Sequence, residues 1–247
     1  MTIQPIRTRR FHPNDALTDF LEASLPKRLP EESILVVTSK IVALSEGRTA
    51  TISPSNTKDK IIAQESRVRL RTPWCWLTRV NGEWCANAGV DASNANGSLI
   101  LLPRDSQKTS SMILRWAKKR YARKRLGVII TDTRIYPLRV GTMGVALGWA
   151  GFEPIRSYIG EPDLFGRVLR HTRANIVHAL AVAAVLTMGE GREQTPVAII
   201  HDAPVRFGRG TMTVRDLAID PRRDLYRLAY QATAAFRSSP TNRSRRK

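Results

Sequence analysis

The amino-acid sequence predicts an α+β fold of mixed, largely antiparallel sheets with packed helices, built as one large domain or as two intertwined subdomains. Strand-like and helix-like segments are interspersed along the chain, and two short segments form hairpins instead of βαβ units. A hydrophobic content of 42% over 247 residues is sufficient for a substantial core. We assign residues 1–236 to this fold and residues 237–247 to a basic tail, which is polar and therefore expected to be mobile.

The first quarter of the chain is expected to form a helix, a strand and a second helix. The first helix covers residues 13–25, with Asn14 or Asp15 as its cap. Residues 33–44 are rich in Ile, Leu and Val and are therefore predicted to form a buried strand. A polar loop containing a proline separates this strand from a short helix over residues 58–66.

A hairpin is predicted around Asn81-Gly82, because this pair is a strong signal for a two-residue turn. The turn pairs Val80 with Glu83 and Thr78 with Cys85. In this register Cys75 lies three positions from the partner of Cys85 and points to the opposite face. A disulfide is therefore not expected, which agrees with a reducing compartment.

The remaining elements are predicted from apolar runs and from the residues that bound them. Strands are expected at residues 98–103, 127–130, 144–148 and 196–200, and helices at residues 109–126, 163–169, 172–188 and 222–236. Thr172 is the expected cap of the helix over 172–188, and Gly189 ends it.

Short polar side chains follow several of these apolar segments. Asp91 lies in a polar loop after the hairpin, Asp132 and Thr133 come where a buried-looking strand ends, and Glu190 follows an apolar helix. Together they make an all-oxygen ligand set of the kind that Mg²⁺ or Mn²⁺ takes, with a substrate phosphate completing the shell. On residue type alone, however, an aspartate in a loop is more often a turn former or a cap than a metal ligand.

Six segments, in this order, carry a resemblance to a known family. They are residues 37–42 with 45–48, the octet Asn-Ala-Gly-Val-Asp-Ala-Ser-Asn at 87–94, residues 127–133, residues 144–148 with Gly151, residues 163–167 and residues 188–191. With these segments the chain resembles the GTP-dependent gamma-glutamyl ligases that add glutamate to the deazaflavin coenzyme F-420. The segments cover most of the chain, and the octet is the most specific of them.

The resemblance implies amide formation driven by GTP, in which an acid is phosphorylated on its carboxylate and the amine of glutamate attacks the acyl phosphate. The implied cofactor is Mg²⁺ or Mn²⁺, with GTP as co-substrate. The implied partners are L-glutamate, an anionic coenzyme-like acid such as a deazaflavin precursor or a folate, and a second copy of the chain in an intertwined homodimer. The implied metal ligands are Asp91, Asp132, Thr133 and Glu190.

The resemblance also implies contacts with the nucleotide. The candidate residues are Ser39, Lys40, Asn94, Met188, Gly189 and Gly191. On residue type alone, Ser39 and Lys40 fit a polar strand end equally well. The chain has no P-loop motif, so oxygen ligands and backbone amides would have to hold the phosphates.

Three places depart from the family pattern. The family follows Asp-Thr with one residue and then Gly-Arg, it carries Asp-Glu on the apolar helix, and it often has a lysine near the nucleotide. In this chain Ile135 and Tyr136 stand in place of Gly-Arg, and His178 and Ala179 stand in place of Asp-Glu. Leu44 stands in place of the lysine. A histidine on an Ala/Val-rich helix is more often a satisfied core residue than a functional one. These changes leave open whether catalysis is kept, redirected or lost.

The net charge is +19, from 40 Lys and Arg against 21 Asp and Glu, and the excess is concentrated near the N-terminus, at residues 115–125 and in the tail. Such patches attract anions. Direct nucleic-acid binding is the less favoured interpretation, because no recognition motif accompanies the charge. It nevertheless defines the alternative function, which is a degenerate family member that binds a nucleotide or RNA without ligating anything.

The apolar run over 176–188 is too short to span a bilayer, and no apolar segment follows the basic N-terminus. We therefore expect a cytoplasmic protein with no membrane partner.

Overall fold

The computed structural model describes residues 1–208 and 212–228. The chain divides into two compact units, one made of residues 1–49 and 100–214, the other of residues 50–99 and the segment from 215 onward. The chain crosses between them at β3 (Thr49–Ala50) and β7 (Leu99–Ile100), which pair as a two-stranded sheet. Helices and largely antiparallel sheets are both present, so the predicted α+β class is confirmed.

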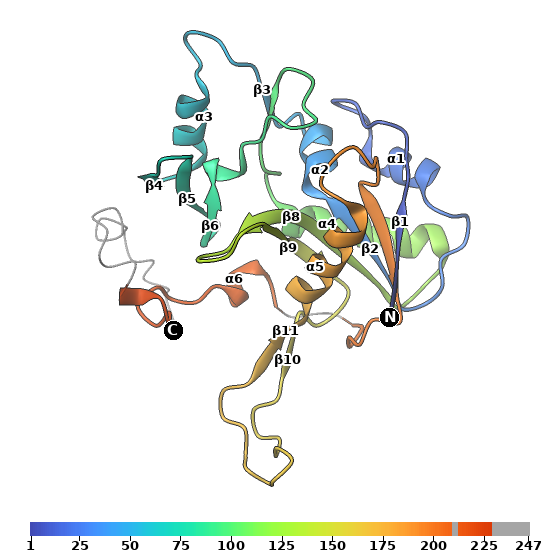
Figure 1. The fold of residues 1–247 in the computed structure, drawn as a ribbon. Coiled ribbons are helices and arrows are strands. Elements are labelled where there is room, and N and C mark those ends of the chain that lie inside the picture. The colour runs from blue at the N-terminus through green and yellow to red at the C-terminus, as the bar shows by residue number, and fades with distance from the viewer. Residues whose placement is uncertain (209–211, 229–247) are drawn as a thin grey trace, which may run out of the picture. The chain divides into compact units, whose positions relative to one another are not determined.

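The larger unit is built on one five-stranded sheet (Figure 1). Its strands, in spatial order, are β1 (Thr2–Ile6), β12 (Val197–His201), β2 (Ser33–Thr38), β8 (Leu126–Ile135) and β9 (Thr142–Ala150). The neighbours β2 and β8 are parallel, whereas the other three pairs are antiparallel. The central strands are buried on both faces, which explains why their sequences are continuously apolar instead of alternating.

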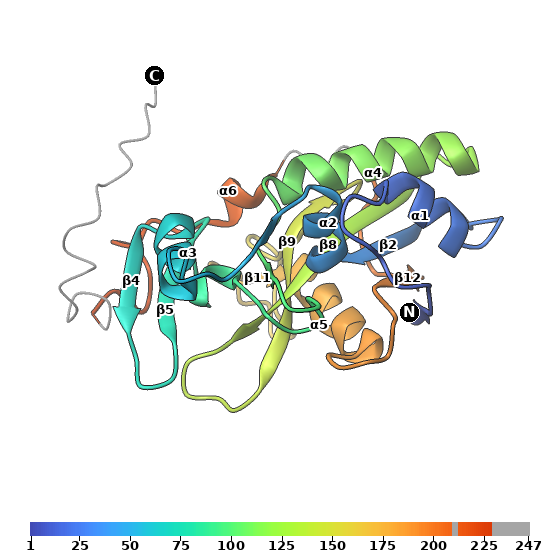
Figure 2. The same cartoon turned by 90° about the horizontal axis from the view of Figure 1, so that it is seen from above.

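Helices cover both faces of this sheet. On one face, α1 (Leu17–Ser24), α2 (Ser39–Ser45) and α4 (Ser106–Tyr121) pack with the strands into one buried cluster. On the other face, α5 (Ile176–Met188) packs against β9, β8 and β1. Figure 2 shows α4 and α5 on opposite sides of the sheet.

Two glycines of β9 allow α4 and α5 to pack closely against the sheet. A Cβ atom on Gly148 would lie 2.4 Å from the carbonyl group of Ser106 in α4, and one on Gly144 would lie 2.5 Å from the carbonyl oxygen of Ala181 in α5. Between them the pairing with β8 shifts register, because Ile130 pairs with Gly148 and Thr131 with Ala146. The extra residue makes a β-bulge, which locally interrupts the ladder of hydrogen bonds.

A hairpin arm made of β10 (Ile155–Ser157) and β11 (Arg173–Asn175) projects away from the sheet of the larger unit (Figure 1). The helix predicted over 163–169 is wrong: the described structure has turns and irregular backbone over residues 158–172, with an isolated antiparallel bridge between Pro162 and Val168. Asp163 organises the end of the arm, where its Oδ1 accepts the backbone N–H groups of Phe165 and Arg167, both at 2.9 Å. Asp163 satisfies two amides in a turn, which competes with helix formation.

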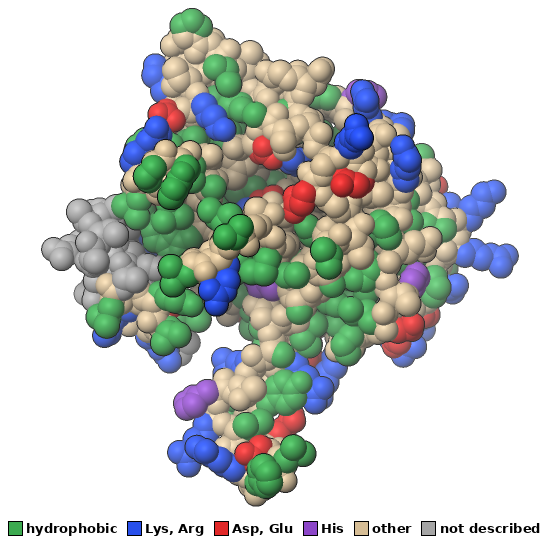
Figure 3. Space-filling model, in the orientation of Figure 1, with side chains coloured by type: hydrophobic (Ala, Val, Ile, Leu, Met, Phe, Trp, Pro, Cys, Tyr) green, Lys and Arg blue, Asp and Glu red, His purple; other side chains and the backbone are tan. Residues whose placement is uncertain are grey.

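Hydrophobic side chains stand at the end of this arm (Figure 3). Leu164 is 97% exposed and Phe165 is 96% exposed. Two adjacent large apolar side chains in this state form an exposed apolar tip on the surface of the larger unit.

The described part of the smaller unit contains a three-stranded antiparallel sheet and short helical segments. They are α3 (Lys58–Glu65), β4 (Val68–Arg71), β5 (Trp76–Val80), β6 (Glu83–Ala86), the 3-10 turn η1 (Asn87–Gly89) and α6 (Val214–Leu217), which begins at the boundary between the units. The predicted hairpin is confirmed in its register, with Val80 opposite Glu83 and Thr78 opposite Cys85. Asn81 and Gly82 both have positive φ, as the turn requires. Cys75 and Cys85 form no disulfide with each other, in agreement with the prediction.

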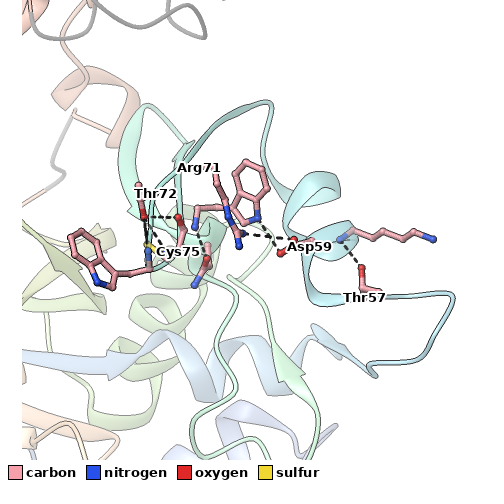
Figure 4. Close-up of polar contacts among 9 residues, drawn as sticks. Thr57, Asp59, Arg71, Thr72 and Cys75 are labelled. Atoms are coloured by element: carbon pink, nitrogen blue, oxygen red, sulfur yellow. Dashed lines mark hydrogen bonds and ion pairs between the residues drawn. The ribbon is translucent and has the colours of Figure 1, made fainter.

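The turn between β4 and β5 is held by one side chain. Thr72 Oγ1 donates to the carbonyl oxygen of Cys75 at 2.7 Å and accepts the N–H of Cys75 at 3.0 Å (Figure 4). Next to this turn, Arg71 lies 3.8 Å from Asp59, and Asp59 also accepts the indole N–H of Trp76 at 3.0 Å. These contacts tie the sheet to α3.

Several predicted boundaries are wrong for local reasons. The helix expected from residue 13 begins at Leu17 without a side-chain cap, because Asp15 binds the N–H of His12 and the guanidinium of Arg9. The helix expected from Thr172 begins at Ile176, where Asn175 is the cap. Only residues 222–228 of the helix predicted over 222–236 lie within the described part of the chain, and most of them form turns.

Two further segments differ from the prediction. The strand expected over 33–44 ends at Thr38 and continues as α2. The basic helix begins at Ser106, earlier than expected, with Asp105 as its cap, and ends at Tyr121 because Ala122 adopts a left-handed conformation. The basic tail, residues 237–247, lies outside the described residues. Within the described residues, no helix has the length and hydrophobicity needed to cross a membrane.

Candidate active site

The parallel pairing of β2 and β8 brings two predicted site residues together. The register runs from Ser33 opposite Leu126 to Thr38 opposite Thr131, so the next residues along the chain are Ser39 and Asp132. Ser39 Oγ donates a hydrogen bond to Asp132 Oδ1 at 3.3 Å. A residue predicted to contact nucleotide and a residue predicted to bind metal thus share one hydrogen bond at the carboxyl end of β2.

The sequence predicted that Asp132 follows the end of a strand, but β8 continues to Ile135, so Asp132 lies within the strand. Its second carboxylate oxygen, Oδ2, is ion-paired with Arg134 Nη1. The two residues are two positions apart in a strand and therefore leave the same face. The side chain of Arg134 is 8% exposed and that of Asp132 is 19% exposed, so this is a largely buried pair.

Arg134 is the main residue that the sequence analysis missed. The same Nη1 that binds Asp132 also donates to the carbonyl oxygen of Thr133 at 2.8 Å. The pattern Asp-x-Arg at the end of an apolar strand was the available signal, since it places opposite charges on one face of the strand.

Thr133 and Lys40 are the chain neighbours of Asp132 and Ser39, in β8 and α2 respectively. Thr133 is half-buried and lies opposite Gly144, on the face of the strand that the Asp132 side chain does not share. Lys40 is the second residue of α2 and is half-buried.

The predicted site residues after α5 lie in a tight turn. Met188 is buried, and Gly189 ends the helix with a φ of 81° while its N–H donates to Val185 at 2.9 Å. The carboxylate of Glu193 accepts the N–H of Gly191 at 2.8 Å, whereas Glu190 is exposed. Glu193, a residue that the sequence analysis did not consider, therefore closes this turn.

His178 supports the β-bulge beside this site. Its Nδ1 accepts the N–H of Ala146 at 3.1 Å, at the residue where the register of β8 and β9 shifts. Burial lowers the pKa of His178, and the positive charge of Arg134 lowers it further. The imidazole is therefore held neutral, with Nδ1 as acceptor and the proton on Nε2. This contact gives His178 a structural role, which agrees with the expectation that a histidine on an Ala/Val-rich helix is a satisfied core residue.

The octet lies in the smaller unit and is conformationally strained. Asn87, Ala88 and Gly89 all have positive φ, at 52°, 56° and 72°. Non-glycine residues rarely adopt this conformation, which costs of order 1–3 kcal/mol for each and persists where the surroundings enforce it. Here Asn87 Oδ1 accepts the N–H of Trp76 at 3.0 Å, and the N–H of Ala88 donates to Thr78 Oγ1 at 2.8 Å.

Asp91 and Asn94 follow this strained turn. Both oxygens of Asp91 accept from Ser93, Oδ1 from its N–H at 2.7 Å and Oδ2 from its hydroxyl at 2.8 Å. Asn94 is exposed and has a φ of 55°. The positive φ values at Asn87, Ala88 and Asn94 give this loop a tightly turned backbone, with its turn held by the bonds to Trp76 and Thr78.

The segment 45–48 has a structural role in the larger unit. Glu46 accepts the N–H of Arg104 at 2.7 Å and the hydroxyl of Thr109 at 3.2 Å, and Arg48 Nε donates to the carbonyl oxygen of Leu102 at 3.0 Å. These bonds fix the segment that leads into α4.

The residues around Asp132 have donors that suit a hard cation. Among the described residues, no group of three or more His, Cys, Asp or Glu side chains is arranged to hold a metal ion. Asp132 Oδ1 and Ser39 Oγ are nevertheless adjacent oxygen donors of the type that Mg²⁺ and Mn²⁺ prefer. A site here would thus be completed by substrate phosphate and water, as is usual for Mg²⁺.

Comparison with known proteins tests the family directly. The model of the F420-0:gamma-glutamyl ligase family matches residues 5–202. The chain belongs to the F420-0:gamma-glutamyl ligase family. The match includes Ser39, the octet, Asp132 and the turn at 188–191, so every segment on which the resemblance rested lies inside it.

Three relatives within the gamma-glutamyl ligases show the extent of the likeness, and each is named coenzyme F420:L-glutamate ligase. The protein from Methanosarcina mazei is 34% identical over 70% of this chain and 75% of its own length. That from Methanopyrus kandleri is 32% identical over 92% of this chain and 98% of its own length. That from Methanothermobacter thermautotrophicus is 41% identical over 60% of this chain and 58% of its own length.

Proposed function

We propose that this chain is a ligase that joins L-glutamate through an amide bond to a coenzyme F420 precursor or to a related acid. The observation that carries the proposal is the family match over residues 5–202, together with relatives named coenzyme F420:L-glutamate ligase that align over most of the chain. The hydrogen bond between Ser39 and Asp132 supports it, because it joins a residue proposed to contact the nucleotide and a residue proposed to bind the cation.

The proposed reaction proceeds in two steps. The carboxylate of the acceptor acid attacks the γ-phosphorus of GTP, which forms an acyl phosphate and releases GDP. The amine of glutamate then attacks the acyl carbon, the amide bond forms, and phosphate leaves as the amine loses a proton. Such chemistry depends on the placement of substrates and on charge stabilisation more than on a protein nucleophile.

GTP and a divalent cation are parts of this proposal. When bound, Mg²⁺ or Mn²⁺ supplies neutralisation of the charge that develops on the transferring phosphoryl oxygens. The residues proposed to hold the cation are Asp91, Asp132, Thr133 and Glu190, and those proposed to contact the nucleotide are Ser39, Lys40, Asn94, Met188, Gly189 and Gly191. For Asp132, the supporting observation is its oxygen neighbour Ser39 at 3.3 Å.

The protein is also proposed to act as a homodimer. The support from the larger unit is the exposed apolar tip of the arm, where Leu164 and Phe165 are almost fully exposed. Contiguous exposed apolar side chains are a feature of protein–protein contact surfaces, and these two residues are adjacent.

The alternative of a nucleic-acid binder has less support from the basic segment 115–125. Several of its groups are engaged within the larger unit: Arg120 pairs with Glu22 at 2.8 Å, Arg123 Nε donates to Leu29 at 2.8 Å, and the N–H groups of Lys124 and Arg125 both donate to the carboxylate of Glu31. These bonds stabilise the end of α4. The charges of Arg120 and Arg125 are also offset by the carboxylates of Glu22 and Glu32, at 2.8 Å and 3.3 Å, so only part of the basic charge is available to a polyanion.

The dependence on GTP and metal is tested by thermal unfolding. GTP with Mn²⁺ is expected to raise the melting temperature, because a ligand that binds only the folded state stabilises it by mass action, and EDTA is expected to abolish the rise. ATP with Mn²⁺ is the matched control, because it tests whether the guanine base is recognised. No shift at millimolar GTP and Mn²⁺ would contradict the proposed use of this nucleotide.

A further inference from the structure

Asp132, a proposed ligand for the divalent cation, is already neutralised by a cation of its own chain. Arg134 Nη1 is ion-paired with Oδ2 of this carboxylate and donates to the Thr133 carbonyl oxygen at 2.8 Å. Because the Arg134 side chain is only 8% exposed, water does little to screen this charge from its neighbours.

The arrangement limits how a metal ion reaches Asp132. The hydroxyl of Ser39 occupies Oδ1 and the guanidinium of Arg134 occupies Oδ2. A hydroxyl oxygen can turn from donor to ligand, so Ser39 is compatible with a cation at Oδ1. A guanidinium has only donors and a permanent charge, so it opposes any cation bound to the same carboxylate.

We propose that Arg134 is an internal cation that competes with the divalent cation for Asp132, and that nucleotide phosphate relieves this competition by giving the guanidinium a second acceptor. The inference rests on the proposed use of GTP and metal, and it assigns Arg134 a positioning role that couples the two ligands. Guanidinium groups bind phosphate oxygens through paired hydrogen bonds, so phosphate is the ligand chemistry best suited to draw Arg134 from a carboxylate.

This competition has a thermodynamic consequence. Without nucleotide, the divalent cation binds weakly, because it has to displace Arg134 or bind beside it. With nucleotide, the cation binds more tightly, and by reciprocity the cation raises the affinity for the nucleotide by the same factor. The coupling also makes it less favourable for a bound cation to remain at Asp132 when no phosphate is present.

The test is a Mn²⁺ titration of the full-length protein without nucleotide, with free Mn²⁺ measured by electron paramagnetic resonance. The variant Arg134→Met removes the charge and keeps most of the side-chain volume. Its affinity for Mn²⁺ is expected to rise by at least about tenfold, within the usual range of coupling between sites. Arg139→Met, an exposed arginine between β8 and β9, is the control for a general loss of positive charge and is expected to leave the affinity unchanged.

Two further variants make the result specific. The double variant Asp132→Asn with Arg134→Met reports Mn²⁺ bound elsewhere and is expected to lose the gain. Arg134→Lys retains a positive charge and is expected to bind Mn²⁺ as weakly as the wild type, which a purely structural role for Arg134 would not predict. If Arg134→Met does not fold, Arg134→Gln removes the charge with a smaller loss of hydrogen bonds and is titrated instead.

The outcomes separate this inference from the proposed function. Equal Mn²⁺ affinity in the wild type and the charge-removing variant, or no binding by either, overturns the competition. A fluorescent GTP analogue then measures the coupling: Mn²⁺ is expected to strengthen its binding more in the wild type than in Arg134→Met. If the variant gains Mn²⁺ affinity but neither protein binds the analogue, the competition for Asp132 stands, whereas the proposed use of GTP and the relief of the competition by nucleotide phosphate both fail.

Discussion

The substitution Asp132→Asn is expected to cost stability as well as metal affinity. A residue that served only as a metal ligand would contribute little to the stability of the fold. In the structure Asp132 lies in β8 and balances the charge of Arg134, which is 8% exposed. The asparagine keeps an oxygen next to Ser39 and removes the negative charge, so the guanidinium stays in a largely buried position without its ion-pair partner.

The magnitude follows from the burial of the pair. Removing one partner of a fully buried ion pair costs about 3–5 kcal/mol, whereas an exposed pair contributes about 0–1 kcal/mol. Because the Asp132 side chain is 19% exposed, solvent offsets part of the loss, and we expect a cost of about 2 kcal/mol in the free energy of unfolding. A double-mutant cycle with Arg134→Met is expected to give a coupling energy of about 1–3 kcal/mol.

Urea unfolding followed by circular dichroism measures both quantities. Glu22→Gln is the matched control, because it breaks the exposed pair of Glu22 with Arg120, whose side chains are 52% and 36% exposed. This control is expected to lose no more than about 1 kcal/mol. A cost for Asp132→Asn no larger than that of the control would refute the argument that the pair is buried and coupled.

Three further predictions concern packing, protonation and assembly. Gly148→Ala is expected to cost about 1–3 kcal/mol in urea unfolding, because its Cβ meets the Ser106 carbonyl group at 2.4 Å, whereas Gly208→Ala, which meets nothing within 4 Å, is expected to be neutral. His178 has a lowered pKa, so below pH 6.5 the unfolded state binds more protons than the folded state. The free energy of unfolding of the wild type is therefore expected to fall as the pH drops from 6.5 towards this lower pKa. His178→Asn is expected to lack that component of the pH dependence. Replacing both Leu164 and Phe165 by aspartate is expected to halve the mass measured by light scattering, and an unchanged mass would contradict the role of the arm in a dimer.

Local sequence patterns predicted the elements whose structure depends on neighbours along the chain. Asn81-Gly82 fixed a hairpin in the expected register because the turn needs two residues that accept positive φ. The helix over 163–169 was wrong because Asp163 binds two nearby amides, a local alternative that hydrophobic periodicity does not reveal.

Contacts between distant parts of the chain were harder to predict. The sequence placed Ser39 and Asp132 among the site residues, but their contact depends on the parallel register of β2 with β8, across 93 positions of the chain. The roles of Arg134 and Glu193 were missed for a different reason: both depend on which way a charged side chain turns, and residue type leaves that open.

The central claim is that this chain forms an amide bond between glutamate and a coenzyme F420-type acid at the expense of GTP. The most direct measurement is mass spectrometry of the acid after incubation with the protein, GTP, Mn²⁺ and glutamate, with released phosphate assayed in parallel. The account predicts a product heavier by one or more glutamyl residues and one phosphate for each amide formed, with neither product nor phosphate when glutamate or GTP is omitted. An unchanged acid with no phosphate above background, from a folded protein that retains RNA, would contradict the account and favour a binding protein that has kept only the ancestry of a ligase.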